Sequence, residues 1–307
     1  MIGGYVEPEE TGELAERAEL AKETLKRCEL CPRKCRVDRT AGELGTCGIG
    51  AEAVVSGHGP HFGEESVLVG CGGSGTVFLT GCNLACVFCQ NYDISHLRRG
   101  SAVTTVRLGG MMAELQDIGC HNVNWVSPTH QVPQLLEALH VAAGIGLRVP
   151  IVYNCGGYES LETLKLLDGV VDIYMPDIKY GANEPGKLYS GVPDYWNRCR
   201  EAIREMRRQV GDLVTEEVER GGRTCRVAAK GVLVRHLVIP NDLAKSSEVA
   251  RFLAQEVSRN TFVNVMAQYR PQYRASDYLE LSRSITSAEY RAAVESFRRE
   301  GIHRFSD

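Results

Sequence analysis

Three cysteines in the segment TGCNLACVFCQN constrain this chain more than any other feature. Cys82, Cys86 and Cys89 are spaced C-x3-C-x2-C and follow directly after the apolar run at residues 76–79. Cysteine sulfur is the soft ligand that iron–sulfur clusters require, and a four-iron cluster normally takes four protein thiolates. A compact set of three therefore predicts a [4Fe-4S] cluster in which one iron is left open to a ligand from outside the protein.

Other kinds of site compete with this interpretation. Zinc would need a fourth nitrogen or sulfur ligand, and His96 lies near enough in the sequence to provide one. A disulfide set or three buried thiols are the remaining structural alternatives. The function depends on the outcome, because a closed zinc or iron–sulfur site would make the chain a non-catalytic module that carries electrons or docks on a partner.

The order of apolar runs predicts an α/β fold. Short β-branched runs alternate with segments of helical spacing, which is typical of βαβ units and a parallel sheet. We expect strands at residues 76–79, 122–126, 149–153, 171–175, 231–239 and 262–266, and helices within residues 14–25, 135–142 and 249–257. Residues 202–230 indicate a solvated helix and hairpin, and the capping-box pattern of Thr286 and Glu289 predicts a C-terminal helix. Periodicity alone does not decide between a barrel and an open sheet.

With Phe88 before the third cysteine, the motif becomes C-x3-C-x-aromatic-C and resembles the defining sequence of the radical S-adenosylmethionine (SAM) superfamily. The resemblance implies a partial (β/α)6 barrel with its site at the C-terminal ends of the strands, where α/β barrels generally place their chemistry. It implies that SAM chelates the open iron, that Phe88 packs near the adenine, and that reductive cleavage yields a 5'-deoxyadenosyl radical that abstracts hydrogen from a substrate. The implied reductant is a flavodoxin- or ferredoxin-like protein.

Polar or small residues follow three of the expected strands, as a ligand site at those ends requires. Glycines such as Gly157 let backbone approach a ligand closely, although an ordinary turn would use one too. Asp177 and Lys179 share a face because strand residues alternate, and a structural salt bridge is the competing account for this pair. The stretches concerned are Ser127–His130, Asn154–Tyr158 and Pro176–Lys179.

From about Cys28 to Pro271 the chain resembles uncharacterised homologues of pyruvate formate-lyase activating enzyme, an activase of a glycyl-radical enzyme. In that activase a Met-Leu-Asp-Leu-Lys segment contributes to a monovalent-cation site beside SAM. Met175, Asp177 and Lys179 match this segment. The resemblance therefore implies that these three residues belong to the cofactor site.

Two departures from the activase pattern change what is expected at this site. Asn154 replaces an acidic cation ligand, and only Gly157 is kept from an Asp-Thr-Asn-Gly stretch, so the cation is placed in doubt. The Gly-Gly-Glu that binds the SAM amino group is replaced by Ser127–His130, where we expect Thr129 to take part of that role and His130 to compete as a helix cap. Loose alignment adds Arg235, His236, Gln268 and Tyr269 as SAM or substrate positions.

A second cysteine group has the spacing C-x2-C-x3-C-x11-C. A zinc site or a second iron–sulfur cluster would each satisfy four thiols on a short loop, and two disulfides are the structural alternative. Only the first two members have the short paired spacing common in zinc sites. We therefore favour zinc or a structural iron–sulfur cluster over a cluster that binds substrate, and the choice of metal stays open. Its members are Cys28, Cys31, Cys35 and Cys47. We expect the remaining cysteines to be ordinary buried thiols, with Cys155 at the edge of the site: Cys71, Cys120, Cys155, Cys199 and Cys225.

Length and charge limit the remaining possibilities. The chain has 307 residues, enough for one α/β domain at residues 67–275 with a metal-binding segment at 1–66 and a helical extension at 276–307. Its net charge of -4 argues against a general binder of nucleic acid or anionic membranes. No apolar run approaches the ~20 residues of a membrane span, so we expect a cytoplasmic protein. The substrate is left open between a backbone glycine of a partner enzyme and a peptide or metabolite.

Overall fold

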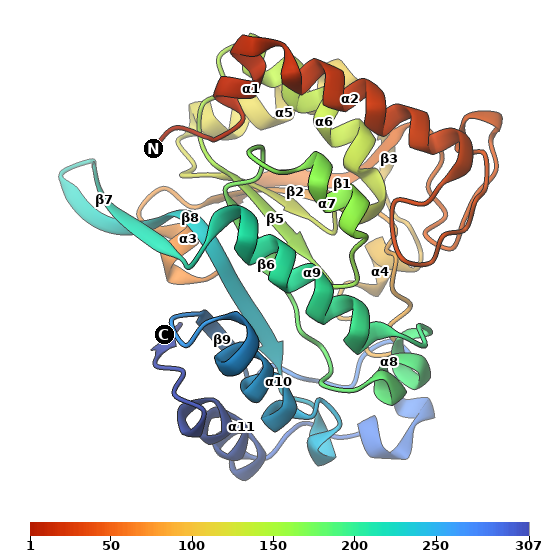
Figure 1. The fold of residues 1–307 in the computed structure, drawn as a ribbon, viewed down its shortest axis with the longest axis vertical. Coiled ribbons are helices and arrows are strands. Elements are labelled where there is room, and N and C mark those ends of the chain that lie inside the picture. Colours follow the sequence, from red (N-terminus) through yellow and green to blue (C-terminus); the bar gives the residue numbers. More distant parts are fainter. Residues whose placement is uncertain (307) are drawn as a thin grey trace.

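Ten strands form one sheet in the computed structural model, which describes residues 1–306 (Figure 1). The strands are β1 (Ala53–His61), β2 (Ser74–Leu79), β3 (Ser101–Val103), β4 (Val123–Val126), β5 (Ile151–Cys155), β6 (Ile173–Pro176), β7 (Val214–Arg220), β8 (Arg223–Leu237), β9 (Phe262–Met266) and β10 (Arg304–Phe305). Their order is β10-β9-β8-β6-β5-β4-β2-β1-β3, and β7 pairs with β8 outside this path. The expected α/β fold with a parallel sheet is confirmed.

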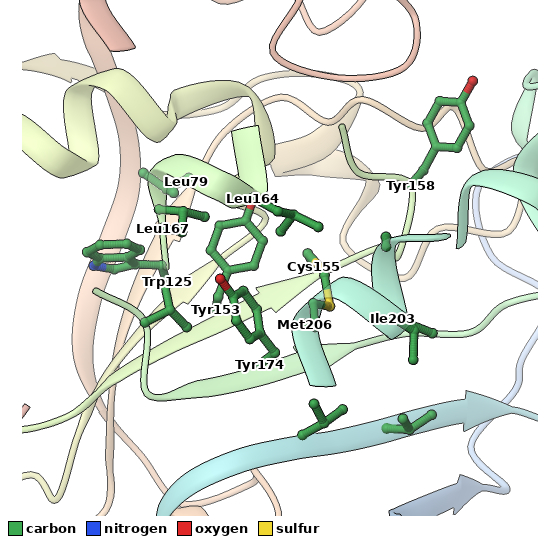
Figure 2. Close-up of a cluster of buried hydrophobic side chains, with 14 of the residues drawn as sticks. Leu79, Trp125, Tyr153, Cys155, Tyr158, Leu164, Leu167, Tyr174, Ile203 and Met206 are labelled. Carbon is green, nitrogen blue, oxygen red and sulfur yellow. The ribbon is translucent and has the colours of Figure 1, made fainter. Parts of the chain in front are cut away.

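Six neighbouring strands, β2, β4, β5, β6, β8 and β9, run parallel and carry the core of the partial barrel. The aromatic residues Trp125, Tyr153 and Tyr174 stand in register across β4, β5 and β6. Figure 2 shows Tyr153 and Tyr174 beside side chains such as Leu164 and Met206 from the covering helices. Because strand residues alternate, this row places the intervening residues of the same strands on the inner face.

Helices lie before, between and after the strands in the chain, and most of them cover the outer face of the sheet. They are α1 (Val6–Thr11), α2 (Glu13–Glu23), α3 (Ser66–Val69), α4 (Tyr92–Ser95), α5 (Thr105–Ile118), α6 (Val132–Gly144), α7 (Leu161–Leu166), α8 (Asn183–Ser190), α9 (Tyr195–Val210), α10 (Ser246–Phe252) and α11 (Ser287–Arg299). The first two pack on α6, and α2 also touches α7. The capping box of Thr286 and Glu289 is confirmed at the start of α11. Among the described helices, none combines the length and the apolar character needed to cross a membrane.

The lower part of the barrel interior is apolar and closed by α3. Leu68 of this short helix is fully buried with Val152, Ile173, Met175 and Leu233, which come from three parallel strands. Further along the same strands, toward their C-terminal ends, the inner face turns polar with Asn154, Asp177 and Arg235. Helix α3 therefore plugs the base of the barrel, and ligands can bind only at the other end, where the strands have their C-termini.

Two expectations about the rest of the chain change. The antiparallel strands β1 and β3, which extend the sheet beyond β2, were not expected, since residues 53–61 contain two glycines and a proline. The expectation that Cys71 and Cys225 are separate buried thiols is wrong, because the two form a disulfide. They are 154 residues apart in the sequence, and no local spacing indicates such a pair.

Candidate active site

The three-cysteine motif lies in the loop between β2 and α4, at the C-terminal end of β2. Gly81 opens the loop with a φ of 76°, a region that favours glycine, and its N–H donates to the Ile94 carbonyl (2.9 Å). On the other side, the N–H of Ala85 donates to the carbonyl of Ser190 (3.1 Å). Main-chain hydrogen bonds therefore hold the loop at its start and between its first two cysteines.

Hydroxyl groups accompany two of the three thiols. The sulfur of Cys86 lies 2.9 Å from the Ser190 hydroxyl, and that of Cys89 lies 3.1 Å from the Ser95 hydroxyl. Burial raises the pKa of Cys82 to about 12 and also raises that of Cys86, so a bound metal would have to supply the positive charge that stabilises the thiolates. Three sulfur donors with neighbouring hydroxyl donors fit the ligand set of an iron–sulfur cluster.

All three thiols line a cavity with about 1080 Å³ of empty space, counting its open mouth. All six parallel strands contribute to the walls at or just beyond their C-terminal ends. These wall residues include Leu79, Val126, Ser127, Asn154, Cys155, Gly156, Asp177, Lys179, Arg235, Leu237, Met266 and Gln268. Three sulfur donors on the same cavity as ionised and polar side chains fit a metal cluster together with a charged cofactor.

Charged side chains form a connected array in the cavity wall. Asp177 accepts from Lys179 Nζ (2.8 Å) and from Arg235 Nε (2.7 Å), while Nη2 of Arg235 donates to Asn154 Oδ1 (2.7 Å). Burial raises the pKa of Asp177, but the charges of Arg235 and Lys179 outweigh it and lower the pKa to about 2. The carboxylate is thus ionised. Asp177 and Lys179 form the salt bridge considered as a structural alternative, and they also line the cavity.

The array continues from the cavity toward the base of the barrel through Glu64. Its carboxylate lies 3.4 Å from Nη1 of Arg235 and 3.0 Å from Nδ1 of His61. Burial raises the pKa of Glu64, and the charge of Arg235 opposes that rise. Sequence reasoning missed Glu64, because it stands in a loop with no motif around it.

Phe88, Met175 and Gly157 take different positions around the cavity. Phe88 lines it and packs edge-on against Tyr269, with ring centres 5.8 Å apart. The Met175 side chain is buried in the apolar cluster below the charged array. Gly157 has a φ of 74°, and a Cβ there would lie 2.7 Å from the Asp177 carbonyl oxygen, so it serves close backbone packing next to the site.

Thr129 and His130 do not reach the cavity wall. The Thr129 hydroxyl donates to Glu159 (2.9 Å), whose other carboxylate oxygen accepts from the Tyr153 hydroxyl (3.0 Å). The structure therefore places Thr129 in a buried pair rather than in contact with the cavity. Nε2 of His130 lies 2.7 Å from the Thr80 carbonyl, and burial lowers the His130 pKa to about 4.

Of two further residues suggested by the loose alignment, one lines the cavity and the other does not. Gln268 lines the cavity, and its carbonyl accepts from Gln90 (2.9 Å). His236, next to the cavity residue Arg235 on β8, points away and is buried between the Ile178 carbonyl (2.7 Å) and the Ser246 hydroxyl (2.9 Å). Only the first of these two is placed to meet a ligand.

The four-cysteine segment packs directly against the motif loop. Arg33, between two of its cysteines, donates to the carbonyls of Asn83 and Ser190. The Cys47 carbonyl faces Gly81 so closely that a Cβ on that glycine would lie 2.7 Å from its oxygen. No pattern in the sequence indicates that the two cysteine groups are neighbours, because β1, α3 and β2 separate them in the chain.

Within the second group, Cys28 and Cys47 are buried and Cys31 and Cys35 are partly exposed. Burial raises the pKa of Cys31 to about 12, and the neighbouring thiols of Cys47 and Cys28 contribute to the rise. Within residues 1–306, three metal-type ligand atoms gather within 4.8 Å of one another at another place, Cys71, His121 and Cys225. Both cysteine groups are more widely spaced than that.

Comparisons with known proteins agree with this geometry. The sequence pattern of the Radical SAM superfamily matches residues 76–216, which contain the three-cysteine motif. The chain is 35% identical over 288 residues to the uncharacterized protein MJ0674 of Methanocaldococcus jannaschii, covering 91% of this chain and 76% of that protein.

Two solved structures of SuiB from Streptococcus suis are also similar, each with 12% sequence identity over 74% of this chain. The one bound to S-adenosylmethionine has a TM-score of 0.49 and is covered to 48%, and the one bound to precursor peptide SuiA has a TM-score of 0.47 and is covered to 46%. The chain thus spans about half the length of SuiB. From the matched pattern and the relative, together with the motif that they contain, it follows that the chain belongs to the radical SAM superfamily.

Proposed function

We propose that the protein binds a [4Fe-4S] cluster through Cys82, Cys86 and Cys89 and holds SAM in the adjoining cavity. The observation that carries this proposal is the convergence of three thiols and a charged array on one cavity at the C-terminal ends of six parallel strands. When bound, the cluster and SAM together supply a 5'-deoxyadenosyl radical that abstracts hydrogen from a substrate. The protein's own contribution is to position the cofactor and to exclude water around it.

The residues of the wall have distinct tasks in this proposal. Phe88 offers an aromatic edge for the adenine, and Asp177 and Lys179 offer opposite charges to the amino and carboxylate groups of the methionyl part. Once Cys86 and Cys89 are thiolate ligands, the hydroxyls of Ser190 and Ser95 would donate hydrogen bonds to their sulfurs, which adjusts the reduction potential of a bound cluster. A flavodoxin- or ferredoxin-like protein is the proposed electron donor.

Arg235 replaces a metal cation beside the cofactor in this proposal. Its guanidinium bridges Asn154 Oδ1 and Asp177 Oδ1, the two side-chain oxygens that would otherwise coordinate a monovalent ion. The guanidinium carries the permanent positive charge that the ion would bring, and Asn154 removes one of the two negative charges that would hold the ion. A positive charge therefore lies beside Asp177 without an added ion.

The four-cysteine segment is proposed to hold a second iron–sulfur cluster rather than zinc. Zinc–sulfur bonds of about 2.3 Å bring tetrahedral ligands to about 3.8 Å from one another, whereas a four-iron cube spreads its ligands further. The wider spacing of Cys28, Cys31, Cys35 and Cys47 supports the cluster. Its packing against the motif loop would suit transfer of an electron between the two metal centres.

The proposed substrate is a backbone glycine of a partner enzyme. Support comes from the match of Met175, Asp177 and Lys179 to the activase segment, and two of these line the cavity. Modification of a peptide or a metabolite is the second candidate. A glycyl activase produces a persistent protein radical in its partner, visible by electron paramagnetic resonance, whereas the other chemistry produces a product of changed mass.

The proposal is tested by anaerobic reconstitution, followed by assays of iron, zinc and 5'-deoxyadenosine in the presence of dithionite and SAM. Cys86→Ala is expected to lose about four irons and all 5'-deoxyadenosine formation. Cys35→Ala is expected to lose instead the roughly four irons of the second cluster and to keep SAM cleavage. The matched control is Cys120→Ala, which removes a buried thiol outside both groups. Wild type that holds iron yet forms no 5'-deoxyadenosine would instead be a non-catalytic electron carrier.

A further inference from the structure

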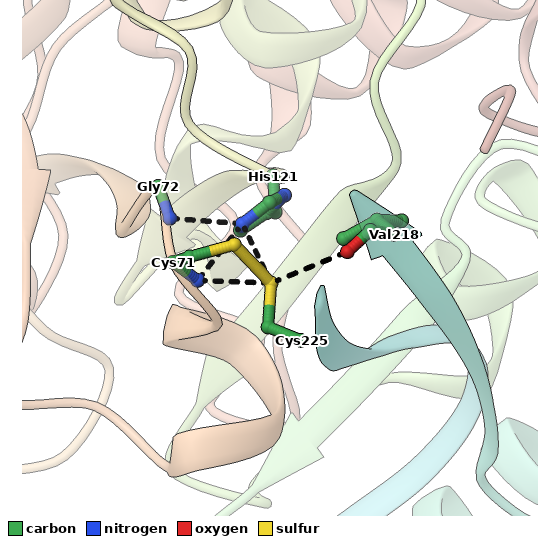
Figure 3. The surroundings of a disulfide bond; sticks show 5 residues. All are labelled: Cys71, Gly72, His121, Val218 and Cys225. Atoms are coloured by element: carbon green, nitrogen blue, oxygen red, sulfur yellow. Dashed lines mark hydrogen bonds between the residues drawn. A yellow bond between two sulfur atoms is a disulfide. The ribbon is translucent and has the colours of Figure 1, made fainter. Parts of the chain in front are cut away.

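The Cys71–Cys225 disulfide connects two parts of the fold that lie at the base of the barrel (Figure 3). Cys71 follows α3 in the turn before β2, and Cys225 stands on β8 opposite Val218 of β7. Both cysteines are partly exposed. A reagent from solution can therefore reach this bond, in contrast to the fully buried thiols of the core.

One backbone donor contacts the disulfide, and a cationic side chain lies next to it in the fold. The N–H of Cys71 donates to the sulfur of Cys225 (3.2 Å), and the guanidinium of Arg220, on the paired strand β7, approaches Gly72 and donates to the Ile118 carbonyl. N–H donors and a nearby guanidinium stabilise a thiolate, which is the reactive form of cysteine. The environment thus suits thiol–disulfide exchange at Cys225.

His121 favours a disulfide over a metal at this place. Its Nε2 atom accepts hydrogen bonds from the N–H groups of Cys71 (3.2 Å) and Gly72 (2.9 Å), as Figure 3 shows. Burial and the charge of Arg220 lower the pKa of His121, which keeps this nitrogen an acceptor. Since the lone pair of Nε2 is engaged by two backbone donors, a metal ligand role would require both bonds to break.

The bond also fastens the plug of the barrel to a strand of the candidate site. On one side, α3 carries Leu68 in the apolar base and is preceded by Glu64, which contacts Arg235. On the other side, Cys225 shares strand β8 with Arg235. The two segments joined by the disulfide therefore meet a second time at the charged array of the cavity.

We infer that Cys71 and Cys225 form a reversible redox site that exchanges with low-molecular-mass thiols and disulfides and clamps α3 to β8. In oxidation, the Cys225 thiolate attacks one sulfur of a small disulfide and releases one small thiolate. The Cys71 thiolate then attacks the Cys225 sulfur of the mixed disulfide and releases the second. The two protein thiols lose two electrons and two protons in total, and the small disulfide is reduced to two thiols. This inference goes beyond the proposed radical chemistry and does not depend on it.

The exchange is tested on the full-length protein under anaerobic conditions in glutathione buffers of stepped reduced-to-oxidised ratio. Free thiols are blocked with N-ethylmaleimide, and the cross-linked Cys71–Cys225 peptide is quantified by mass spectrometry. The fraction cross-linked is expected to fall as the reduced-to-oxidised ratio rises, in Cys120→Ser as in wild type, and to be zero in Cys225→Ser. A fraction that stays at zero or at one throughout the series overturns the inference.

Two further measurements test the clamp and the metal alternative. Hydrogen exchange of residues 66–73 and 214–227 is expected to become several-fold faster on reduction, with no change in α11, and equal rates in both redox states would refute the clamp. Zinc is measured in wild type and in Cys225→Ser, because the four-cysteine segment is common to both. One extra zinc per wild-type chain, together with protection of both cysteines from alkylation, would show a metal site in place of the disulfide.

Discussion

Arg235 donates from Nη2 to Oδ1 of Asn154 across 2.7 Å, and the same guanidinium donates from Nε to Asp177. One planar side chain thus connects the ends of β5 and β6 from its place on β8. A guanidinium carries a fixed positive charge, as an alkali ion does, but it also has five N–H donors in one plane and is part of the protein chain. The identity of residue 154 and that of residue 235 are therefore linked, although they are far apart in the sequence.

The first prediction concerns this cation function. SAM cleavage by wild type is expected to proceed at equal rates in sodium, potassium and lithium salts of equal ionic strength. Arg235→Ala is expected to lower kcat/KM for SAM about ten- to hundredfold, the equivalent of roughly 1.5–3 kcal/mol for hydrogen bonds to charged groups. Arg226→Ala, which removes an exposed arginine from the same strand, is the matched control. Strong activation of wild type by one alkali ion would contradict the assignment.

The second prediction concerns Glu159, which is buried with Thr129 and Tyr153. Burial raises its pKa from 4.5 to about 7, although hydrogen bonds from both neighbours oppose the rise. The folded state then binds a proton that the unfolded state releases between pH 4.5 and 7, so stability falls as pH rises through this window. As the pH rises from 4.5 to 7, the unfolding free energy of Glu159→Gln is expected to increase by roughly 3 kcal/mol relative to that of wild type.

Urea unfolding at a series of pH values measures this difference. Glu162→Gln is the matched control, because Glu162 is exposed in a surface pair with Lys165. The control is expected to run parallel to wild type at every pH. If Glu159→Gln also ran parallel, the carboxyl group would be ionised in the folded protein across the whole range.

The third prediction concerns Gly81, the motif-loop residue that packs against the Cys47 carbonyl of the second cysteine group. Gly81→Ala is expected to lower the unfolding free energy by about 1–3 kcal/mol, because alanine is strained at positive φ and its Cβ would meet the Cys47 carbonyl. Iron content should fall with it, since the motif loop shifts. Gly57→Ala, where a Cβ meets nothing within 4 Å, is expected to change neither quantity. Equal iron content in both variants would show that the contact does not position the cysteines.

Apolar runs in the sequence predicted the bounds of the buried strands to within a few residues. β9 has the expected bounds, and β4 differs by one residue. The next two strands begin two residues late, at Ile151 and Ile173; the first of these follows Pro150, which has no N–H for the sheet. β8 begins eight residues before the expected Gly231, because its first half is a polar hairpin partner of β7 and shows no apolar run.

For the site, the sequence predicted the residues that belong to short motifs and missed those that meet through the fold. Asn154, Asp177 and Lys179 line the cavity as expected of strand ends, and Phe88 does too. Glu64 and Ser190 were not expected, since each reaches the site from an element without a sequence signature. Thr129 was expected from its position after β4, but a buried partner, Glu159, takes its hydroxyl.

The position of the four-cysteine segment has a consequence for biosynthesis. The segment is translated early, yet its contacts come from much later residues: the Thr163 hydroxyl donates to the Leu30 carbonyl (2.8 Å), and Arg33 reaches the Ser190 carbonyl (3.3 Å). Chains emerge from the ribosome N-terminus first. These thiols are thus synthesised well before the residues on which their segment docks, so during translation they stay accessible from solution until Thr163 and Ser190 have emerged.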